Sequence, residues 1–397
     1  MLSSLKVVEL ATMVAAPAAA GLLADWGAQV VKIEPHSGDP MRGAPGSPLG
    51  SINFDLHNRN KRSIALNTAA PDTRDVIIKL VAQADIFITN VLPGQLEKLR
   101  LDWATLHALF PRLVYGAVSS FGPMGPDRDR GATDNLGFWA RAGGTALLTV
   151  EGQDPLPIRQ SVGDRITGAL TCAGILAAAL EAQRSGRGRF VDTSLLSAGM
   201  WTFSTDISNY LNRGRTALSK GRRDAVMPLA NYFRTRDGRW LQVHTNVTLM
   251  AKALSRPDLA DDPRFNGPQR PTRENNAALV DLLDQVVSEF DYEDIKARFE
   301  AAGVRCEPVN MPADLKEDPQ VRATGRLIEV EGGADAARWQ VASPWILMEE
   351  DAPLAQRAGV APGIGRHTSE ILEELGYSAE AIARMRANGT IPSAQDG

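Results

Sequence analysis

The chain of 397 residues has only two cysteines, Cys172 and Cys306. They are too few for a disulfide framework or a cysteine-based metal site, so we expect no metal. The formal net charge of −4 argues against a nucleic-acid partner. No run of 18 apolar residues is free of charge, so we expect no membrane-spanning helix.

Two nucleotide-binding patterns are also missing. The first predicted turn, residues 11–17, reads ATMVAAP and has no glycine where a dinucleotide-binding fingerprint needs several. The missing glycines disfavour a dinucleotide cofactor. The P-loop pattern is absent too. The beginning of the chain, MLSSLKVVEL, lacks the basic region and cleavage site of a secretion signal. We therefore expect a cytoplasmic protein.

Segments with strand and helix patterns alternate along the first 120 residues. This alternation predicts an α/β fold that opens with a βαβ-like unit. The long polar segment 37–63 is rich in Gly, Pro, Ser and Asn, which predicts a loop, and loops of this length are usually functional. The predicted strands are 5–10, 29–34, 64–66, 86–90 and 113–119, and the predicted helices are 15–26, 72–84 and 95–109.

The pattern changes beyond residue 215. A hairpin signal at Asp237-Gly238 is followed by helical patterns near 248–256, 273–288 and 293–302, which together predict a smaller α+β domain. We therefore divide the chain into three parts. Residues 1–215 form the first part of a large domain, 225–325 form the small domain, and 326–397 return to the large one.

Asp164 precedes the longest apolar segment of the chain. The small-residue run 166–180 predicts a helix that is buried on most sides, although Gly168 and Gly174 weaken it unless close packing requires them. A carboxylate just before a helix has two interpretations. It is an ordinary N-cap, or it is an ionised group able to act as a nucleophile. The residues alone do not choose between them.

Two further features have alternative interpretations. The basic residues Arg59, Lys61 and Arg62 form either a solvated cluster or a contact for ligand phosphates. The aromatic pair Phe138-Trp139 and the nearby Met200-Trp201 either line an apolar pocket or belong to the core.

Eight segments in order carry a resemblance to a known family. The chain resembles the class III CoA-transferases, which include formyl-CoA transferase, carnitine CoA-transferase and the related alpha-methylacyl-CoA racemase. The resemblance covers almost the whole chain. The segments are VVELATMVAAPAAAGLLADWGAQVVKIEP (7–35), NKRSIALN (60–67), ITNVLPG (88–94), GDRITGALTCAGILAAALEAQRSGRGRFVDTSL (163–195), DPRFNGPQRPTRENNAAL (262–279), AGVRCEPVN (302–310), DPQV (318–321) and GIGRHTSEILEELG (363–376).

This resemblance implies a fold and an activity. It implies a Rossmann-like large domain that contains both termini, a smaller α+β domain, and a homodimer of two interlocked rings. The implied activity is transfer of CoA from an acyl-CoA donor to a free carboxylic acid acceptor, with coenzyme A thioesters as substrates and no permanently bound cofactor. Asp164 matches the family nucleophile, which forms a mixed anhydride and then an aspartyl-CoA thioester.

The resemblance also implies contacts for CoA. Met13, Leu66 and Leu99 match such positions, although each is also a candidate core residue. Pro35 stands where the family often has Arg, which shifts the expected phosphate contacts to His36, Arg42 or the Arg59–Arg62 cluster. The full set of expected CoA-binding residues is Met13, Val14, Arg42, Arg62, Leu66, Asn90, Val91, Lys98, Leu99 and Thr133.

Departures from the family pattern bear on the alternatives. Racemase relatives have a His where this chain has Thr133, and without it two-base α-proton transfer loses one partner. A racemase or isomerase is therefore the weaker alternative, and a non-catalytic CoA-binding protein is the other. The glycine run of formyl-CoA transferase is replaced by residues 221–225, so a formyl and oxalate pair is disfavoured. Arg222 or Arg223 there meets a substrate carboxylate or belongs to a solvated linker.

Overall fold

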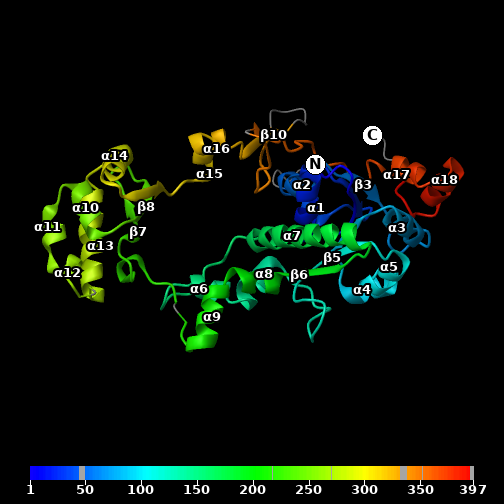
Figure 1. Cartoon of the computed structure of the whole chain (residues 1–397). Helices are drawn as coiled ribbons and strands as arrows, with labels where there is room; N and C mark the ends of the chain where they lie inside the picture. The colour runs from blue at the N-terminus through cyan, green and yellow to red at the C-terminus, as the bar shows by residue number, and fades with distance from the viewer. Residues whose placement is uncertain (44–49, 217, 270, 331–337, 351, 394–397) are drawn as a thin grey trace. The chain divides into compact units, whose positions relative to one another are not determined.

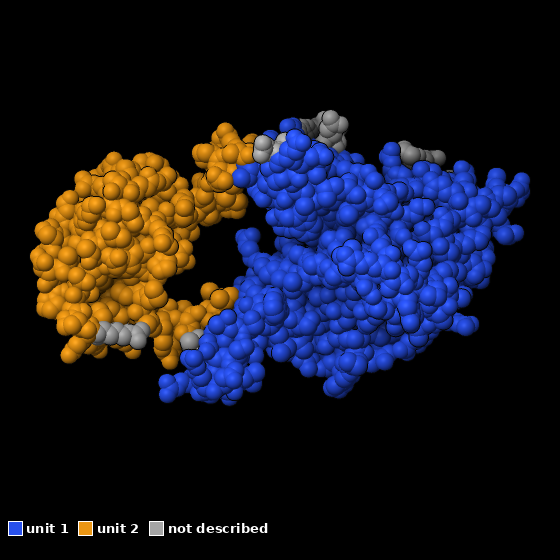
Figure 2. Space-filling model, in the orientation of Figure 1, with its two compact units in different colours: residues 1–145, 157–216, 324–397 blue, residues 146–156, 217–323 orange. Residues whose placement is uncertain are grey.

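The computed structural model describes residues 1–43, 50–216, 218–269, 271–330, 338–350 and 352–393 (Figure 1). The chain divides into two compact units (Figure 2), and the sequence-based boundaries at 215 and 326 lie beside two of the breaks between them. Residues 146–156, which we had assigned to the large domain, group with the second unit instead. The first unit comprises Met1–Thr145, Pro157–Thr216 and Thr324–Gly397, and the second comprises Ala146–Leu156 and Ala217–Ala323.

A six-stranded sheet forms the centre of the first unit. All neighbouring strands pair in parallel, in the order β3-β2-β1-β4-β5-β6. This is the order of doubly wound nucleotide-binding domains, in which the chain reverses its direction of travel between β1 and β4. The prediction of an α/β fold is confirmed. The strands are β1 (Lys6–Leu10), β2 (Gln29–Glu34), β3 (Arg62–Ala65), β4 (Ile86–Thr89), β5 (Val114–Ser119) and β6 (Phe190–Ser194).

Helices cover both faces of this sheet because its strands are apolar on both sides. Val7 points into a cluster with the helices α1 and α7, whereas Val8 points into a cluster on the other face with α3, α4, α5, α17 and α18. The bounds are α1 (Ala15–Asp25), α3 (Thr73–Ala82), α4 (Pro93–Leu99), α5 (Trp103–Leu109), α7 (Val162–Ser185), α17 (Thr368–Glu374) and α18 (Ala379–Ala387).

The remaining elements of the first unit are short, and one of them, α6, crosses the break between the two units. They include two small antiparallel pairs, β10 with β11 and β12 with β13. The bounds are η1 (Pro40–Arg42), α2 (Gly50–Asn58), η2 (Asn135–Arg141), α6 (Gly144–Leu148), α8 (Leu195–Thr202), α9 (Ser204–Arg213), β10 (Leu327–Val330), β11 (Arg338–Val341), β12 (Met348–Glu349) and β13 (Ala352–Pro353).

Helix α7 confirms the helix predicted around residues 166–180 and extends further at both ends, but it is not buried on most sides, because Ala173, Ala177 and Leu180 form an exposed side in the single chain. A Cβ atom on Gly168 would lie 2.7 Å from the carbonyl oxygen of Ala15 in α1, and one on Gly174 would lie 2.9 Å from Val191. Close packing therefore explains both glycines. Helix α7 is long and apolar enough to span a membrane by length and composition alone. Core helices also meet this criterion, and α7 packs on the sheet and on α1.

The second unit is built around a three-stranded antiparallel sheet, β7-β8-β9, whose first two strands form the predicted hairpin. Its core also takes side chains from α10, α13 and α14. The bounds are η3 (Arg222–Asp224), β7 (Ala230–Arg234), β8 (Trp240–His244), α10 (Val247–Leu254), α11 (Pro257–Asp261), α12 (Pro263–Asn266), α13 (Arg273–Val287), α14 (Tyr292–Ala302), β9 (Arg305–Pro308), α15 (Pro312–Leu315) and α16 (Pro319–Ala323).

Two local predictions are wrong. The segment 37–63 is not one long loop, because it contains η1, α2 and the start of β3, while its residues 44–49 lie outside the described part. The predicted helix 95–109 is two helices, α4 and α5. They are separated at Arg100, whose backbone is left-handed with a φ of 53°.

Candidate active site

A cavity of about 450 Å³ opens at the carboxyl end of the sheet, where the strand order reverses. Open α/β sheets bind ligands at this edge because loops from neighbouring strands part there. Residues 13–15, 90–92 and 118–120, at or just after the carboxyl ends of β1, β4 and β5, line the cavity together with residues 131–134, 160–161 and 164–165.

Two non-glycine residues on this wall have left-handed backbone conformations. Met13 has a φ of 70° and Ser161 has a φ of 69°. Such a conformation costs on the order of 1 kcal/mol or more, and it persists where surrounding contacts hold it. Met13 turns the chain from β1 into α1, and Ser161 is the residue before α7.

Asp164 lies on the cavity wall in the first turn of α7, as its third residue. The prediction that it precedes the helix as an N-cap is wrong, because Ser161 occupies that position. Burial and then the nearby Asp134 carboxylate raise the pKa of Asp164 to about 6, while Arg165 acts in the opposite direction. The group is therefore mostly ionised at pH 7.

Asp134 is a second carboxylate against the same helix turn. It is only 3% exposed, and a Cβ atom on Gly163 would lie 2.3 Å from its Oδ1, so only glycine fits there. Neither carboxylate oxygen has a direct hydrogen-bond partner among the described residues. Burial raises the pKa of Asp134, and the nearby backbone N–H groups of residues 161–164 oppose this shift although none of them has the geometry of a full hydrogen bond to the carboxylate. Two carboxylates thus share the start of α7.

Arg165 is the one basic residue among the described residues that line the cavity. Its side chain is exposed and donates a 3.2 Å hydrogen bond to the carbonyl oxygen of Ser161. The described residues also contain no group of three or more His, Cys, Asp or Glu arranged to hold a metal ion. The charged groups on this wall are therefore two carboxylates and one guanidinium.

The structure brings six of the predicted site residues together and separates the others. The cavity is lined by Met13, Val14, Asn90, Val91, Thr133 and Asp164. Leu66 does not line it and is fully buried in the core, as its alternative interpretation expected. Leu99 packs against the same core cluster, and Lys98 is exposed on α4 away from the cavity lining.

The basic residues expected at the CoA phosphates are engaged elsewhere. Arg42 pairs with Glu34 at 2.7 Å, and Arg62 pairs with Glu370 and Glu374, both at 2.9 Å. Neither arginine lines the cavity. That Arg42 and Arg62 bind the CoA phosphates stays a prediction, and their positions in the structure do not support it.

The rest of the Arg59–Arg62 cluster is neither solvated nor exposed to a ligand. Arg59 is buried in an ion pair with Asp25, and Lys61 is buried against Glu9 at 2.6 Å. Both interpretations from sequence were therefore wrong for these two residues, because each has a buried carboxylate partner from a distant segment.

Other candidates also have partners. Arg222 and Arg223, both in the second unit, pair with Asp284 and Asp281 of α13. Phe138 and Trp139 belong to a small core cluster with Leu195 and Ala198, which favours the core interpretation. His36 contacts the carbonyl oxygen of Thr390 at 3.2 Å.

Sequence reasoning missed Asp134 and Arg165 as site residues. Arg165 had a usable signal, since a residue next to a candidate nucleophile in the first turn of a helix lies near the same opening. Asp134 had none, because nothing in the sequence indicates that it meets a helix turn 30 residues further along the chain.

Comparisons with known proteins find relatives that match almost the whole chain. The family described as CoA-transferase family III matches residues 2–368. The (R)-2-hydroxy-4-methylpentanoate CoA-transferase of Clostridioides difficile is 29% identical, with 97% of this chain and 98% of that protein covered. The cinnamoyl-CoA:phenyllactate CoA-transferase of Clostridium sporogenes is also 29% identical, with 98% and 97% covered.

A solved structure is similar over nearly the same span. The crystal structure of a CAIB/BAIF family protein from Brucella suis matches with a TM-score of 0.83 and 29% identity. The match covers 94% of this chain and 99% of that one.

Proposed function

The chain belongs to CoA-transferase family III, and on this premise we propose that it transfers CoA between an acyl-CoA and a free carboxylic acid through a covalent intermediate on Asp164. The observation that carries the proposal is the half-buried, largely ionised carboxylate of Asp164 on the wall of the cavity at the sheet's carboxyl edge. A carboxylate is a weak nucleophile in water, and partial desolvation makes it a stronger one.

The first half of the reaction loads CoA onto the enzyme. A carboxylate oxygen of Asp164 attacks the thioester carbon, the C–S bond breaks, and CoA leaves as a thiolate from a mixed anhydride. The thiolate then attacks the Asp164 carbonyl carbon of that anhydride. The C–O bond to the original acyl group breaks, the first acid leaves as a carboxylate, and Asp164 becomes an aspartyl-CoA thioester.

The second half reverses these steps with the acceptor. The acceptor carboxylate attacks the aspartyl thioester, which releases CoA thiolate and forms a second anhydride. The thiolate attacks the acceptor's acyl carbon and frees Asp164. No net proton is consumed, and the energy of the thioester is retained throughout, provided that water is excluded. Backbone N–H groups in the first turn of α7 are suited to stabilise the oxyanions of these steps.

We propose further that the acceptor is a 2-hydroxy carboxylic acid held by Arg165. The two relatives described above are named for 2-hydroxy-4-methylpentanoate and phenyllactate, which are both 2-hydroxy acids. Asp164 is an uncharged thioester when the acceptor carboxylate binds, so the charge that repels the acceptor is that of Asp134, and Arg165 is the cation beside it on the described cavity wall. A guanidinium binds a carboxylate through two parallel hydrogen bonds, which offsets this repulsion.

The mass of the intact protein tests the covalent step. After incubation with a panel of acyl-CoAs, we expect a CoA adduct that maps to the peptide containing Asp164, and a hydroxamate at the same residue when hydroxylamine is present. Asp164→Asn should abolish the adduct and the transfer while CoA binding persists. An adduct on another residue, or transfer by the variant, would refute the mechanism. Exchange of the α-hydrogen with deuterated solvent in the absence of acceptor would instead indicate a racemase or isomerase.

Arg165→Gln tests the acceptor site. We expect the KM for the acceptor acid to rise about tenfold, because a charge-assisted bidentate contact is lost, while formation of the aspartyl-CoA adduct changes less. Arg159→Gln is the matched control, since Arg159 is also exposed and does not line the cavity. An unchanged acceptor KM in Arg165→Gln would exclude this role.

A further inference from the structure

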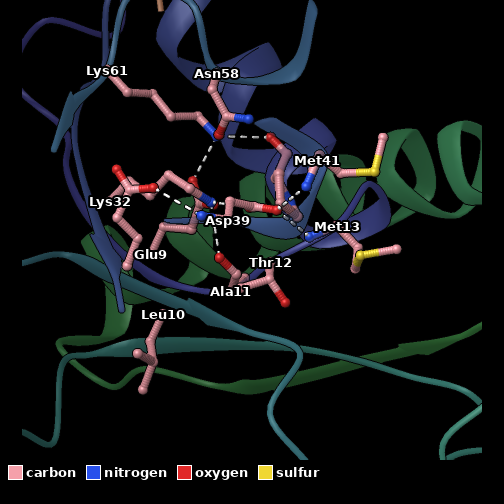
Figure 3. A network of polar contacts seen from close by, with 12 residues as sticks. Glu9, Leu10, Ala11, Thr12, Met13, Lys32, Asp39, Met41, Asn58 and Lys61 are labelled. Carbon is pink, nitrogen blue, oxygen red and sulfur yellow. Dashed lines mark hydrogen bonds and ion pairs between the residues drawn. The ribbon is translucent and has the colours of Figure 1, made fainter. Parts of the chain in front are cut away.

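The buried carboxylate of Asp39 binds the backbone of the turn between β1 and α1, which comprises residues 11–14. Asp39 Oδ1 accepts hydrogen bonds from the backbone N–H of Met13 at 3.1 Å and of Met41 at 2.9 Å. Met13 and Val14 face the cavity that contains Asp164. The carboxylate therefore fixes the peptide of the residue whose left-handed backbone shapes this wall (Figure 3).

Asp39 is itself held by a chain of buried charges. Its Oδ2 lies 2.9 Å from Nζ of Lys32, and both side chains are fully buried. Lys32 Nζ also donates to Glu9 Oε1 at 2.9 Å and to the carbonyl oxygen of Ala11 at 2.8 Å, so the same ammonium fixes the first residue of the turn. Figure 3 shows the lysine between the two carboxylates.

A second buried lysine, Lys61, completes this network of charged side chains. Lys61 Nζ donates to Glu9 Oε2 at 2.6 Å, to Asn58 Oδ1 at 2.9 Å and to the carbonyl oxygen of Pro17 in α1 at 3.0 Å. Burial alone would raise the pKa of Glu9, but the two lysines outweigh it and lower this pKa. The network therefore holds two cations and two anions, and each carboxylate has a buried ammonium partner.

Asn90, the residue after β4, makes a second set of hydrogen bonds to the same turn. Asn90 Oδ1 accepts the N–H of Thr12 at 3.1 Å, and its Nδ2 donates to the carbonyl oxygen of Thr12 at 2.7 Å. Polar side chains from β2 and from the segments that follow β2 and β4 thus bind the backbone of residues 11, 12 and 13. Buried ion pairs add little net stability, because desolvation offsets their attraction, so geometry is the better explanation for this arrangement.

We propose that Asp39 is a positioning residue that sets the β1–α1 turn for acyl-CoA binding beside Asp164. The proposal rests on the function proposed above for the reaction, but the position of the turn is measurable without turnover. Displacing a substrate-contacting wall by about 1 Å can reduce a rate by about a hundredfold. The acceptor atom offered to Met13, rather than the charge of Asp39, is the feature that the turn requires.

Three variants separate this role from a merely structural one. Asp39→Asn keeps an oxygen acceptor for Met13 and Met41, whereas Asp39→Ala removes it. Asp25→Asn is the matched control, since Asp25 is also a buried carboxylate in an ion pair, with Arg59, and does not line the cavity. We expect Asp39→Ala to raise the KM for acyl-CoA and the Kd for CoA about tenfold or more. Asp39→Asn keeps the acceptor but turns an amide NH2 group toward the Lys32 ammonium, so we expect a smaller effect than in Asp39→Ala, and we expect Asp25→Asn to leave both constants unchanged.

Hydrogen exchange of the peptide containing residues 11–14 provides a readout without catalysis. Exchange should be faster in Asp39→Ala and unchanged in Asp25→Asn, even if both lose thermal stability. If Asp39→Ala does not fold, Asn90→Ala releases the turn from its other side; because Asn90 itself lines the cavity, faster hydrogen exchange of residues 11–14 must then accompany any rise in the two constants. Wild-type KM and Kd values in folded Asp39→Ala, or in Asn90→Ala if that variant is needed, would overturn the proposal. A wild-type enzyme that binds CoA but transfers none would contradict the proposed function and leave this test intact.

Discussion

The two carboxylates at the start of α7 set the pH range in which Asp164 is a nucleophile. Burial, and then repulsion from Asp134, raise the pKa of Asp164 to about 6, so the attacking form predominates only above that pH. We expect the rate of aspartyl-CoA formation to rise between pH 5 and 7 and then to level off, with a midpoint near 6. Single-turnover kinetics across this range would measure the midpoint.

Asp134→Asn provides the control for this pH dependence. Removing the Asp134 charge removes the second-largest cause of the raised pKa, so the acidic limb should move to lower pH. Because the two groups interact, the midpoint belongs to the pair rather than to either residue. A midpoint that stays in place, or one that moves to higher pH, would show that Asp134 does not act on Asp164 in this way.

The same pKa shift predicts that the nucleophile lowers the stability of the fold. The folded state keeps the proton of Asp164 up to about pH 6, whereas the unfolded chain releases it near 3.8. Stability therefore falls as pH rises through this window, by on the order of 3 kcal/mol at most. Asp164→Asn should raise the free energy of unfolding at pH 7.5 and make little difference at pH 3.5. Denaturant titrations at the two pH values test this, and an equal effect at both would contradict it.

Helix α7 packs against α1 at Gly168, and this close contact predicts that an alanine there destabilises the protein. Alanine normally stabilises a helix relative to glycine by about 1 kcal/mol. At Gly168 a Cβ atom would lie 2.7 Å from the carbonyl oxygen of Ala15 and 2.9 Å from Cβ of Ala18, so the helices must separate. We expect Gly168→Ala to destabilise the protein by about 1–3 kcal/mol.

Denaturant unfolding would measure this effect against a matched substitution. Gly363→Ala makes the same change where no neighbour lies within 4 Å and the backbone is not left-handed. It should be nearly neutral. A stabilising Gly168→Ala would mean that α1 and α7 move apart at little cost.

The elements that the sequence predicted well are those with a strong local pattern. The strands β1, β2, β4 and β5 are short apolar runs bounded by turn residues, and α7 is a long run of small apolar residues. The helix α2 was missed because its composition is polar, and its place is set by tertiary contacts such as the buried Phe54. The break between α4 and α5 was missed because Arg100 has the left-handed backbone there, with neither glycine nor proline to mark it.

The site was predictable only where a resemblance supplied it. Asp164 came from the family pattern, and its wall partners Met13 and Asn90 came with it. The basic residues were misjudged because their partners are remote in sequence. Lys61 pairs with Glu9, and Arg62 pairs with residues more than 300 positions away. A local charge pattern cannot distinguish a solvated lysine from one in a buried network.

The surface of the single chain carries exposed apolar side chains on α8 and α9. Trp201 is 70% exposed and Leu211 is 76% exposed, and Tyr210 and Met200 lie on the same two helices. No residue of α9 is buried in the single chain. Apolar surface of this kind marks an interface more often than a free surface. We therefore expect a second copy of the chain to cover these helices.

A homodimer of interlocked rings makes a stronger prediction than a dimer joined by surface contacts alone. Threaded rings separate only if a chain opens, so subunit exchange is limited by unfolding rather than by dissociation, and unfolding half-lives reach about days in slowly unfolding domains. Two populations of different mass, mixed under native conditions, should remain homodimers in native mass spectra, and heterodimers should form after joint unfolding and refolding. Heterodimers that form within minutes of mixing would mean that the subunits meet only through their surfaces, and a monomer at micromolar concentration would exclude the dimer itself.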